Sequence, residues 1–100
     1  MFRTVYRRGR WAHGQLLSVG VVANNATQAR VGLRTKRGLK GAAVRNRLKR
    51  QVRAVIRSQE RILHPGLDLV VVLHPPAPPV TTATLERELL LLCKRLGAVL

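Results

Sequence analysis

The densest group of side chains that could bind a ligand lies between residues 45 and 53, where five of nine residues are Lys or Arg. Such cations bind phosphate, and a guanidinium can do so through two parallel hydrogen bonds. The glycine-containing segment 36–41 just before them adds Lys36 and Arg37. Because no acid follows until Glu60, an ordinary solvated helix face of mixed charge is the weaker interpretation. The pattern predicts a polyanion site.

Groups that could perform catalysis within the protein are few and scattered. Three of the four acids, Glu60, Glu86 and Glu88, fall in predicted helices, and the three histidines stand in separate segments that we interpret as connections: His13, His64 and His74. The sequence holds no HExxH, CxxC or GxSxG motif and no GxxxxGK[S/T] loop. We therefore expect no catalytic residue and no metal site in the protein itself.

The aromatic residues gather at the start of the chain, where arginines surround them: Phe2, Tyr6 and Trp11 among Arg3, Arg7, Arg8 and Arg10. Aromatic rings interleaved with Arg can stack unpaired bases. Phe2, Val5 and Tyr6 also share one face of a predicted helix over residues 2–8. Packing of the two rings against a sheet is thus an equally good interpretation, and both roles can coexist.

The elements that must position these groups follow from the hydrophobic pattern. A helix is predicted over residues 42–61, because its apolar and basic residues separate onto opposite faces. The apolar face comprises Val44, Leu48, Val52, Val55 and Ile56. The opposite face comprises Asn46, Arg50, Arg53, Arg57 and Arg61, with Lys49 at its edge. The start of this helix already favours anions through its unpaired N–H groups.

The remaining segments predict strands and one further helix. Residues 15–23 and 29–35 are interpreted as strands joined by a turn at 24–27, which predicts an antiparallel hairpin. The apolar run 67–73 fits a central strand covered on both faces. A proline-rich loop at 75–79 leads to a helix over 82–96, whose buried stripe is Leu85, Leu89, Leu92, Cys93 and Leu96. The order α-β-β-α-β-α, with another short strand possible within 10–25, predicts one α+β domain over residues 1–100.

Charge and cysteine content limit the partners and the compartment. The formal net charge is +15, and residues 1–60 hold 15 of the 19 basic residues but only one acid. A polyanion would relieve this self-repulsion, so nucleic acid is the expected partner. The single cysteine, Cys93, excludes an intramolecular disulfide and favours a reducing cytoplasm. No apolar stretch is long enough to cross a membrane.

Several blocks of the sequence resemble one family. Residues 43–50, Ala-Val-Arg-Asn-Arg-Leu-Lys-Arg, are similar to the RNR signature of the protein subunit of bacterial ribonuclease P. Residues 2–10 resemble the first helix of that family, with its aromatic pair and basic-glycine exit. Residues 30–33 and 65–72 resemble the strands before and after the signature, and residues 85–89 resemble the closing helix. The blocks occur in the family's order and cover nearly the whole chain.

The resemblance implies a fold and a function. It implies helices packed on a mixed four-stranded sheet with a left-handed βαβ crossover, as in a ribosomal-protein domain. Because the chain starts inside the resembling helix, we expect a shortened first helix. It also implies a subunit that assists removal of the 5′ leader from precursor tRNA. In that family the ribonuclease P RNA performs the hydrolysis with Mg²⁺, and no membrane and no obligate protein partner is involved.

The resemblance also implies roles for individual residues. The catalytic RNA would contact the signature helix and the loop before it, through Arg45, Asn46, Arg47, Lys49, Arg50, Arg53, Lys36 and Arg37. The single-stranded leader would lie along the first helix, at Phe2, Tyr6, Arg7 and Arg8. Family members often carry an aromatic residue in the first long strand, and we assign that position to Val19 in this chain.

Two other binding classes remain open at this stage. A ribosomal or other structural RNA-binding protein would have the same composition, and specific retention of precursor tRNA would argue against it. A duplex-DNA binder would place the basic helix in the major groove, but Asn46 is the one evident base-reading residue there besides Arg and Lys.

Overall fold

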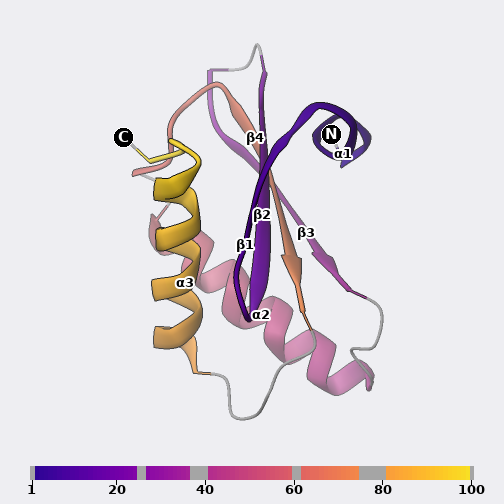
Figure 1. The fold of residues 1–100 in the computed structure, drawn as a ribbon. Coiled ribbons are helices and arrows are strands. Elements are labelled where there is room, and N and C mark those ends of the chain that lie inside the picture. Colours follow the sequence, from indigo (N-terminus) through magenta and orange to yellow (C-terminus); the bar gives the residue numbers. More distant parts are fainter. Residues whose placement is uncertain (1, 25–26, 37–40, 60–61, 75–80, 100) are drawn as a thin grey trace.

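The chain folds into three helices and one mixed four-stranded sheet, as the α+β prediction required (Figure 1). The computed structural model describes residues 2–24, 27–36, 41–59, 62–74 and 81–99. Its elements, in chain order, are α1 (Phe2–Arg8), β1 (Arg10–His13), β2 (Leu17–Ala23), β3 (Arg30–Thr35), α2 (Ala42–Gln59), β4 (Leu67–Leu73) and α3 (Thr82–Arg95). In Figure 1, α2 runs behind the strands, α3 lies to their left and α1 lies at the upper right. Helices α2 and α3 both pack on the core side of the sheet.

The strand order β1-β2-β4-β3 corrects the predicted hairpin. β2 and β3 are not neighbours, because β4 lies between them, antiparallel to β2 and parallel to β3. The reason is the composition of β4, which is apolar along nearly its whole length. Such a strand is stable only with a neighbour on each side and cover on both faces. The hairpin that does form joins β1 to β2, and β1 is the short additional strand allowed within residues 10–25.

The parallel pair is connected through α2 by a left-handed crossover. With β3 and β4 both pointing down in Figure 1, the chain passes from β3 behind the sheet along α2 and returns to β4 on the left of β3. Nearly all βαβ connections have the opposite hand, so this one distinguishes the fold. It agrees with the expectation drawn from the family resemblance.

The main hydrophobic core lies between the sheet and the two helices behind it. Alternate residues of β2 and β4 point to this side and pack against buried side chains of α2 and α3: Leu17, Val19, Val21, Leu69, Val71, Leu73, Leu48, Val52, Val55, Leu85, Leu89 and Leu92. Cys93 and Leu96 belong to the same cluster, which confirms the stripe predicted for α3. Burial raises the pKa of the Cys93 thiol to about 11, which suits a core residue rather than a nucleophile.

One residue of helix α2 departs from the sequence pattern. Val44 was predicted to join the core, but 36% of its surface is exposed. The first turn of α2 extends past the end of β3 (Figure 1), so burial begins only at Leu48. Helix α3 ends as predicted, with Gly97 in the left-handed region at φ 68°. No helix within the described ranges is both long and apolar enough to span a bilayer.

The opposite face of the sheet is covered only in part. Val5 of α1 and Val70 of β4 are fully buried but stand outside the main core, and α1 contacts both β2 and β4. The short helix is therefore held on this face through Val5, whereas the exposed fraction of Tyr6 is 47%. Among the described residues no other element covers this side of the sheet, and His13, Ser18 and Arg34 lie there.

Candidate nucleic-acid interface

Helix α2 presents a row of cations to solvent. Asn46, Arg47, Arg50 and Arg53 are exposed, and Arg45 and Lys49 are partly buried. These six residues are called the α2 basic face below. Their exposure follows from the helical period, since the residues between them, Leu48 and Val52, are anchored in the core.

The charge of the exposed arginines Arg47, Arg50 and Arg53 is not neutralised by carboxylates within the described part of the chain. There, the one ion pair joins Arg30 to Asp68, at 2.7 Å between Nε and Oδ1. No carboxylate among the described residues pairs with Arg47, Arg50 or Arg53. Like charges at such spacings destabilise a helix, so a bound polyanion would stabilise α2.

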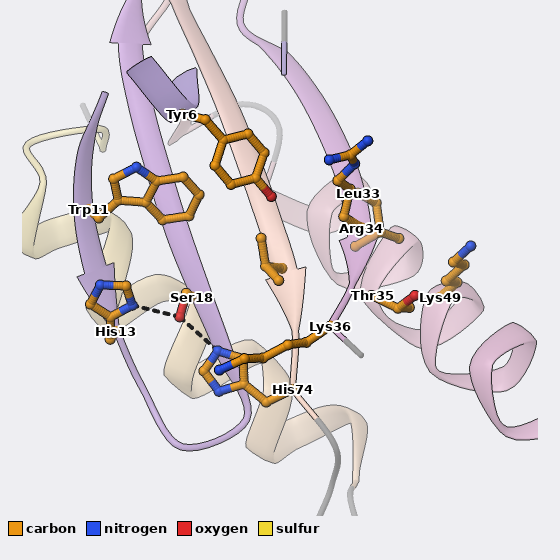
Figure 2. Close-up of a pocket in the computed structure, with 11 residues that line it drawn as sticks. Tyr6, Trp11, His13, Ser18, Leu33, Arg34, Thr35, Lys36, Lys49 and His74 are labelled. Carbon is orange, nitrogen blue, oxygen red and sulfur yellow. Dashed lines mark hydrogen bonds between the residues drawn. The ribbon is translucent and has the colours of Figure 1, made fainter. Parts of the chain in front are cut away.

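A second feature lies on the open face of the sheet, where a cavity of about 1210 Å³ is formed. It is called the sheet pocket below. Figure 2 shows the rings of Trp11 and His13 on one side of it and Arg34, Thr35 and Lys49 on the other. Its lining comes from α1, all four strands and α2: Tyr6, Trp11, His13, Ser18, Leu33, Arg34, Thr35, Lys36, Lys49, Val72 and His74. Because Lys49 belongs to both, the pocket adjoins the α2 basic face.

Aromatic rings form one wall of the sheet pocket. The Tyr6 and Trp11 centroids are 5.2 Å apart with an interplanar angle of 28°, and the Trp11 and His13 centroids are 6.1 Å apart at 6°. The guanidinium carbon of Arg34 lies 4.7 Å from the Phe2 ring centroid and 5.8 Å from that of Tyr6. These cation–π contacts connect β3 to α1 across the open face.

A chain of three polar side chains occupies one end of the pocket. The Ser18 hydroxyl lies 2.8 Å from Nδ1 of His13 and 2.7 Å from Nε2 of His74 (Figure 2). The register explains the first contact, because His13 of β1 is paired with Ser18 of β2. His74 follows the end of β4, and its backbone N–H donates to the carbonyl of Leu16. Two histidines that the sequence placed in separate connections thus meet, and His13 lies in a strand.

The sequence-predicted site residues divide between the two surfaces. Tyr6, Lys36 and Lys49 line the sheet pocket, and Phe2 adjoins it through Arg34. Arg7 and Arg8 are exposed at the end of α1 and are not among the lining residues. Arg37 lies outside the described residues. Val19 is fully buried in the core, so the position assigned to a family aromatic points away from the pocket.

Four polar side chains of the pocket wall were not among the site residues predicted from the sequence: His13, Ser18, Arg34 and His74. Trp11 was a stacking candidate from the sequence, and His13 lies on the same face of β1 because it stands two residues further along the strand. No sequence pattern indicated that Ser18 and His74 are neighbours, because only the antiparallel pairing of β2 with β4 brings them together.

Two carboxylates near these surfaces, those of Glu88 and Asp68, make hydrogen bonds that stabilise the fold. Glu88 of α3 accepts backbone N–H groups of Gln15, Leu16 and Leu17, at 2.6, 2.8 and 3.1 Å. This fixes the β1–β2 turn on which the pocket wall depends. A side chain at Gly14 would collide with the Glu88 carboxylate.

The other carboxylate, Asp68, accepts from Nε and Nη2 of Arg30 and from Nδ2 of Asn24. The bond from Arg30, with a smaller contribution from Asn24, lowers the pKa of Asp68 against the opposing effect of burial. Arg30 is therefore engaged within the fold. Within the described ranges, no group of three or more His, Cys, Asp or Glu side chains is placed to hold a metal ion.

Comparison with known proteins gives a consistent result. A family model described as Ribonuclease P matches residues 1–97. The ribonuclease P protein component of Synechocystis is 41% identical over 76 residues, which cover 74% of this chain and 61% of that protein. The protein component of Beutenbergia cavernae is 38% identical over 88 residues, covering 87% and 74%. The structure of the RNase P protein from Thermotoga maritima superimposes with a TM-score of 0.83 at 29% identity, over 94% of this chain and 92% of that one. The chain therefore belongs to the ribonuclease P protein family.

Proposed function

We propose that this chain is the protein subunit of a ribonuclease P ribonucleoprotein, and that it assists removal of the 5′ leader from precursor tRNA. The observation that carries the proposal is the α2 basic face, whose exposed arginines have no carboxylate partner among the described residues. Family membership supplies the identity of the RNA partner. A reducing cytoplasm suits the buried, unpaired thiol of Cys93.

The ribonuclease P RNA is proposed to bind the α2 basic face together with Lys36 and Arg37. Arg47, Arg50 and Arg53 reach solvent from a helix held rigidly by Leu48 and Val52, so their spacing is fixed before binding. Because the backbone of α2 is already ordered, binding costs only the entropy of the arginine side chains, whereas a flexible tail would also lose backbone entropy.

The leader of precursor tRNA is proposed to lie across the sheet pocket, with Phe2, Tyr6, Arg7 and Arg8 of α1 along its path. The pocket combines aromatic rings with the cations Arg34, Lys36 and Lys49, which is the composition that binds single-stranded nucleic acid. Its volume of about 1210 Å³ exceeds the roughly 300–1,000 Å³ of small-molecule sites. An extended stretch of chain suits it better than one small ligand.

Hydrolysis of the phosphodiester is proposed to take place in the RNA subunit, with the Mg²⁺ ions held mainly by RNA. The side chains described in this protein do not form a metal-binding cluster. Asp68 and Glu88 are occupied by Arg30 and by the β1–β2 turn. The protein's contribution is affinity and positioning of the substrate, and no obligate protein partner is needed for that role.

The test is equilibrium binding of the purified protein to a bacterial ribonuclease P RNA. We expect Arg47→Ala combined with Arg50→Ala to keep the fold, because both side chains are exposed, and to weaken binding by at least about 1–3 kcal/mol. The matched control is Arg87→Ala combined with Arg95→Ala on α3, which removes the same charge from exposed positions outside this surface. Equal losses in the two double variants would mean that only net charge matters, and would refute the assignment of the α2 basic face.

A further inference from the structure

Ser18 joins two histidines at one end of the sheet pocket. Its hydroxyl oxygen lies 2.8 Å from Nδ1 of His13 and 2.7 Å from Nε2 of His74, and Ser18 itself is buried. Figure 2 shows these three residues, which come from β1, from β2 and from the end of β4. Two imidazole nitrogens are thus held against a single oxygen, and both rings also line the pocket.

The serine bridge is compatible with every charge state of the two rings. When both imidazoles are neutral, the hydroxyl donates its one hydrogen to one ring and accepts a hydrogen bond from the other. When both are protonated, the oxygen accepts an N–H from each ring through its two lone pairs, and the hydroxyl hydrogen is released to another acceptor. Protonation therefore leaves neither bridging nitrogen without a partner.

The other charged groups that face this pair are cations. Arg34 of β3, Lys36 directly after it and Lys49 of α2 line the same pocket, and α1 contributes the phenol of Tyr6. No carboxylate lines the pocket among the described residues, and Glu88 of α3 is engaged by backbone N–H groups of the β1–β2 turn. Protonation of the histidines adds positive charge to this group of cations, and a phosphate offsets that charge. Binding of phosphate and uptake of protons therefore favour each other.

We propose that the His13–Ser18–His74 cluster is a proton-coupled phosphate site. The second ring nitrogens, Nε2 of His13 and Nδ1 of His74, make no hydrogen bond with the described residues. In the protonated pair both carry hydrogen, and together with Lys36 they bind a phosphodiester of the RNA. Imidazole changes charge between about pH 5 and pH 8, so the affinity for RNA falls as the pH rises through this range. The inference rests on the proposed function and adds to it a dependence on pH that is independent of the bases.

The probe is an abasic strand of tetrahydrofuran phosphodiesters, which has no base to stack and whose charge does not change in this pH range. Its binding to the full chain is measured by polarisation of a labelled strand at pH 6 and pH 8, at one ionic strength. Each proton fully taken up on binding changes the affinity about tenfold per pH unit, so we expect binding to be at least about 10-fold weaker at pH 8. Calorimetry at pH 7 in two buffers of different ionisation enthalpy should show net uptake of protons.

The third histidine supplies the matched control. His13→Gln combined with His74→Gln should reduce the loss between pH 6 and pH 8 to less than about twofold. His64→Gln, at an exposed position outside the pocket, should leave the loss as in the wild type. His74→Arg introduces a charge that does not titrate in this range, and should retain at pH 8 more of the affinity measured at pH 6. The terminal amine, which also titrates near this range, is common to all variants.

Trp11 provides an independent readout of His13. The chain has one tryptophan, and its ring is stacked with that of His13, at 6.1 Å between centroids and an interplanar angle of 6°. The indole lies flat on β2, because a Cβ added at Gly20 would come within 2.6, 2.7 and 2.8 Å of three of its ring atoms. A protonated imidazole quenches a neighbouring indole, so the abasic strand at pH 7 should lower the emission of the wild type but not that of His13→Gln.

An affinity that is the same at pH 6 and pH 8 in the wild type, or an equal loss in the folded double histidine variant, would overturn the inference. Neither result bears on whether the wild-type chain supports cleavage of precursor tRNA by ribonuclease P RNA. If the wild-type chain fails in that cleavage assay while proton-coupled binding persists, the proposed function is refuted and the cluster stands as a phosphate site of another RNA-binding protein.

Discussion

Replacing Glu88 by Ala removes a carboxylate that fastens α3 to the β1–β2 turn. Its oxygens accept three backbone N–H groups, from Gln15, Leu16 and Leu17. A hydrogen bond to a charged group contributes about 1.5–3 kcal/mol. The N–H of Gln15 lies at an exposed position, where water can replace the carboxylate, so its loss costs little. The other two are partly buried, which gives an expected loss of about 3–6 kcal/mol in the free energy of unfolding.

The assay is urea unfolding, with Glu86→Ala as the matched control. Glu86 is exposed on the same helix, and its side chain makes no hydrogen bond among the described residues, although its backbone carbonyl accepts one from Gln59. We expect the control to change stability by less than about 0.5 kcal/mol. If both variants lose the same free energy at an unchanged denaturant slope, the carboxylate does not hold the turn. Because that turn carries His13 and Ser18, Glu88→Ala should also weaken binding of single-stranded RNA.

Three further predictions follow from buried groups. The pKa of Asp68 is lowered below its unfolded value of 3.8, so its stabilising contribution is present in full above about pH 4 and is lost as the pH falls through the folded value. Urea unfolding between pH 7 and pH 2 should show this loss, and Asp68→Asn should flatten the acid limb; an equally steep limb in the variant would assign the loss to other groups. The Cys93 thiol, with its pKa raised to about 11, is roughly one part in a thousand thiolate at pH 8. Thiol labelling should therefore be orders of magnitude slower in buffer than in urea, and equal rates would show that Cys93 is accessible in the folded chain. Gly20→Ala places a methyl group within 2.6 Å of the Trp11 ring and should cost about 1–3 kcal/mol, with a shift in tryptophan emission as the ring moves; an unchanged emission spectrum would contradict the flat packing of the indole on β2.

The sequence predicts the structure correctly where one helix or strand has a hydrophobic pattern of its own. The 3.6-residue period predicted the buried stripe of α3 and that of α2 apart from Val44, and the apolar run 67–73 predicted a central strand, which β4 is. Local pattern failed at strand pairing, because adjacency in the chain favours a β2–β3 hairpin while burial of β4 on both faces forces β4 between them. β1 was too short, at four residues, to show a period.

The two candidate surfaces also differ in how well the sequence predicts them. The α2 basic face could be predicted because its residues are consecutive and one helix displays them. The sheet pocket could not, because six elements contribute to it and its closest contacts join residues far apart in the chain. Ser18 meets His74 only through the pairing of β2 with β4, and Arg34 reaches Phe2 only once α1 is docked through Val5. Gly20 is a further example, because the reason for a glycine there is the Trp11 ring that packs against it, and Trp11 lies on another strand.

The most direct test of the account is reconstitution of cleavage at low Mg²⁺. The purified chain is mixed with a bacterial ribonuclease P RNA and a labelled tRNA precursor, under conditions in which the RNA alone is nearly inactive. We expect the chain to restore cleavage at the mature 5′ end. The Arg47→Ala and Arg50→Ala double variant should lose this effect, whereas the Arg87→Ala and Arg95→Ala double variant should keep it. Binding of the RNA without any restored cleavage would contradict the account, and would favour a structural RNA-binding role instead.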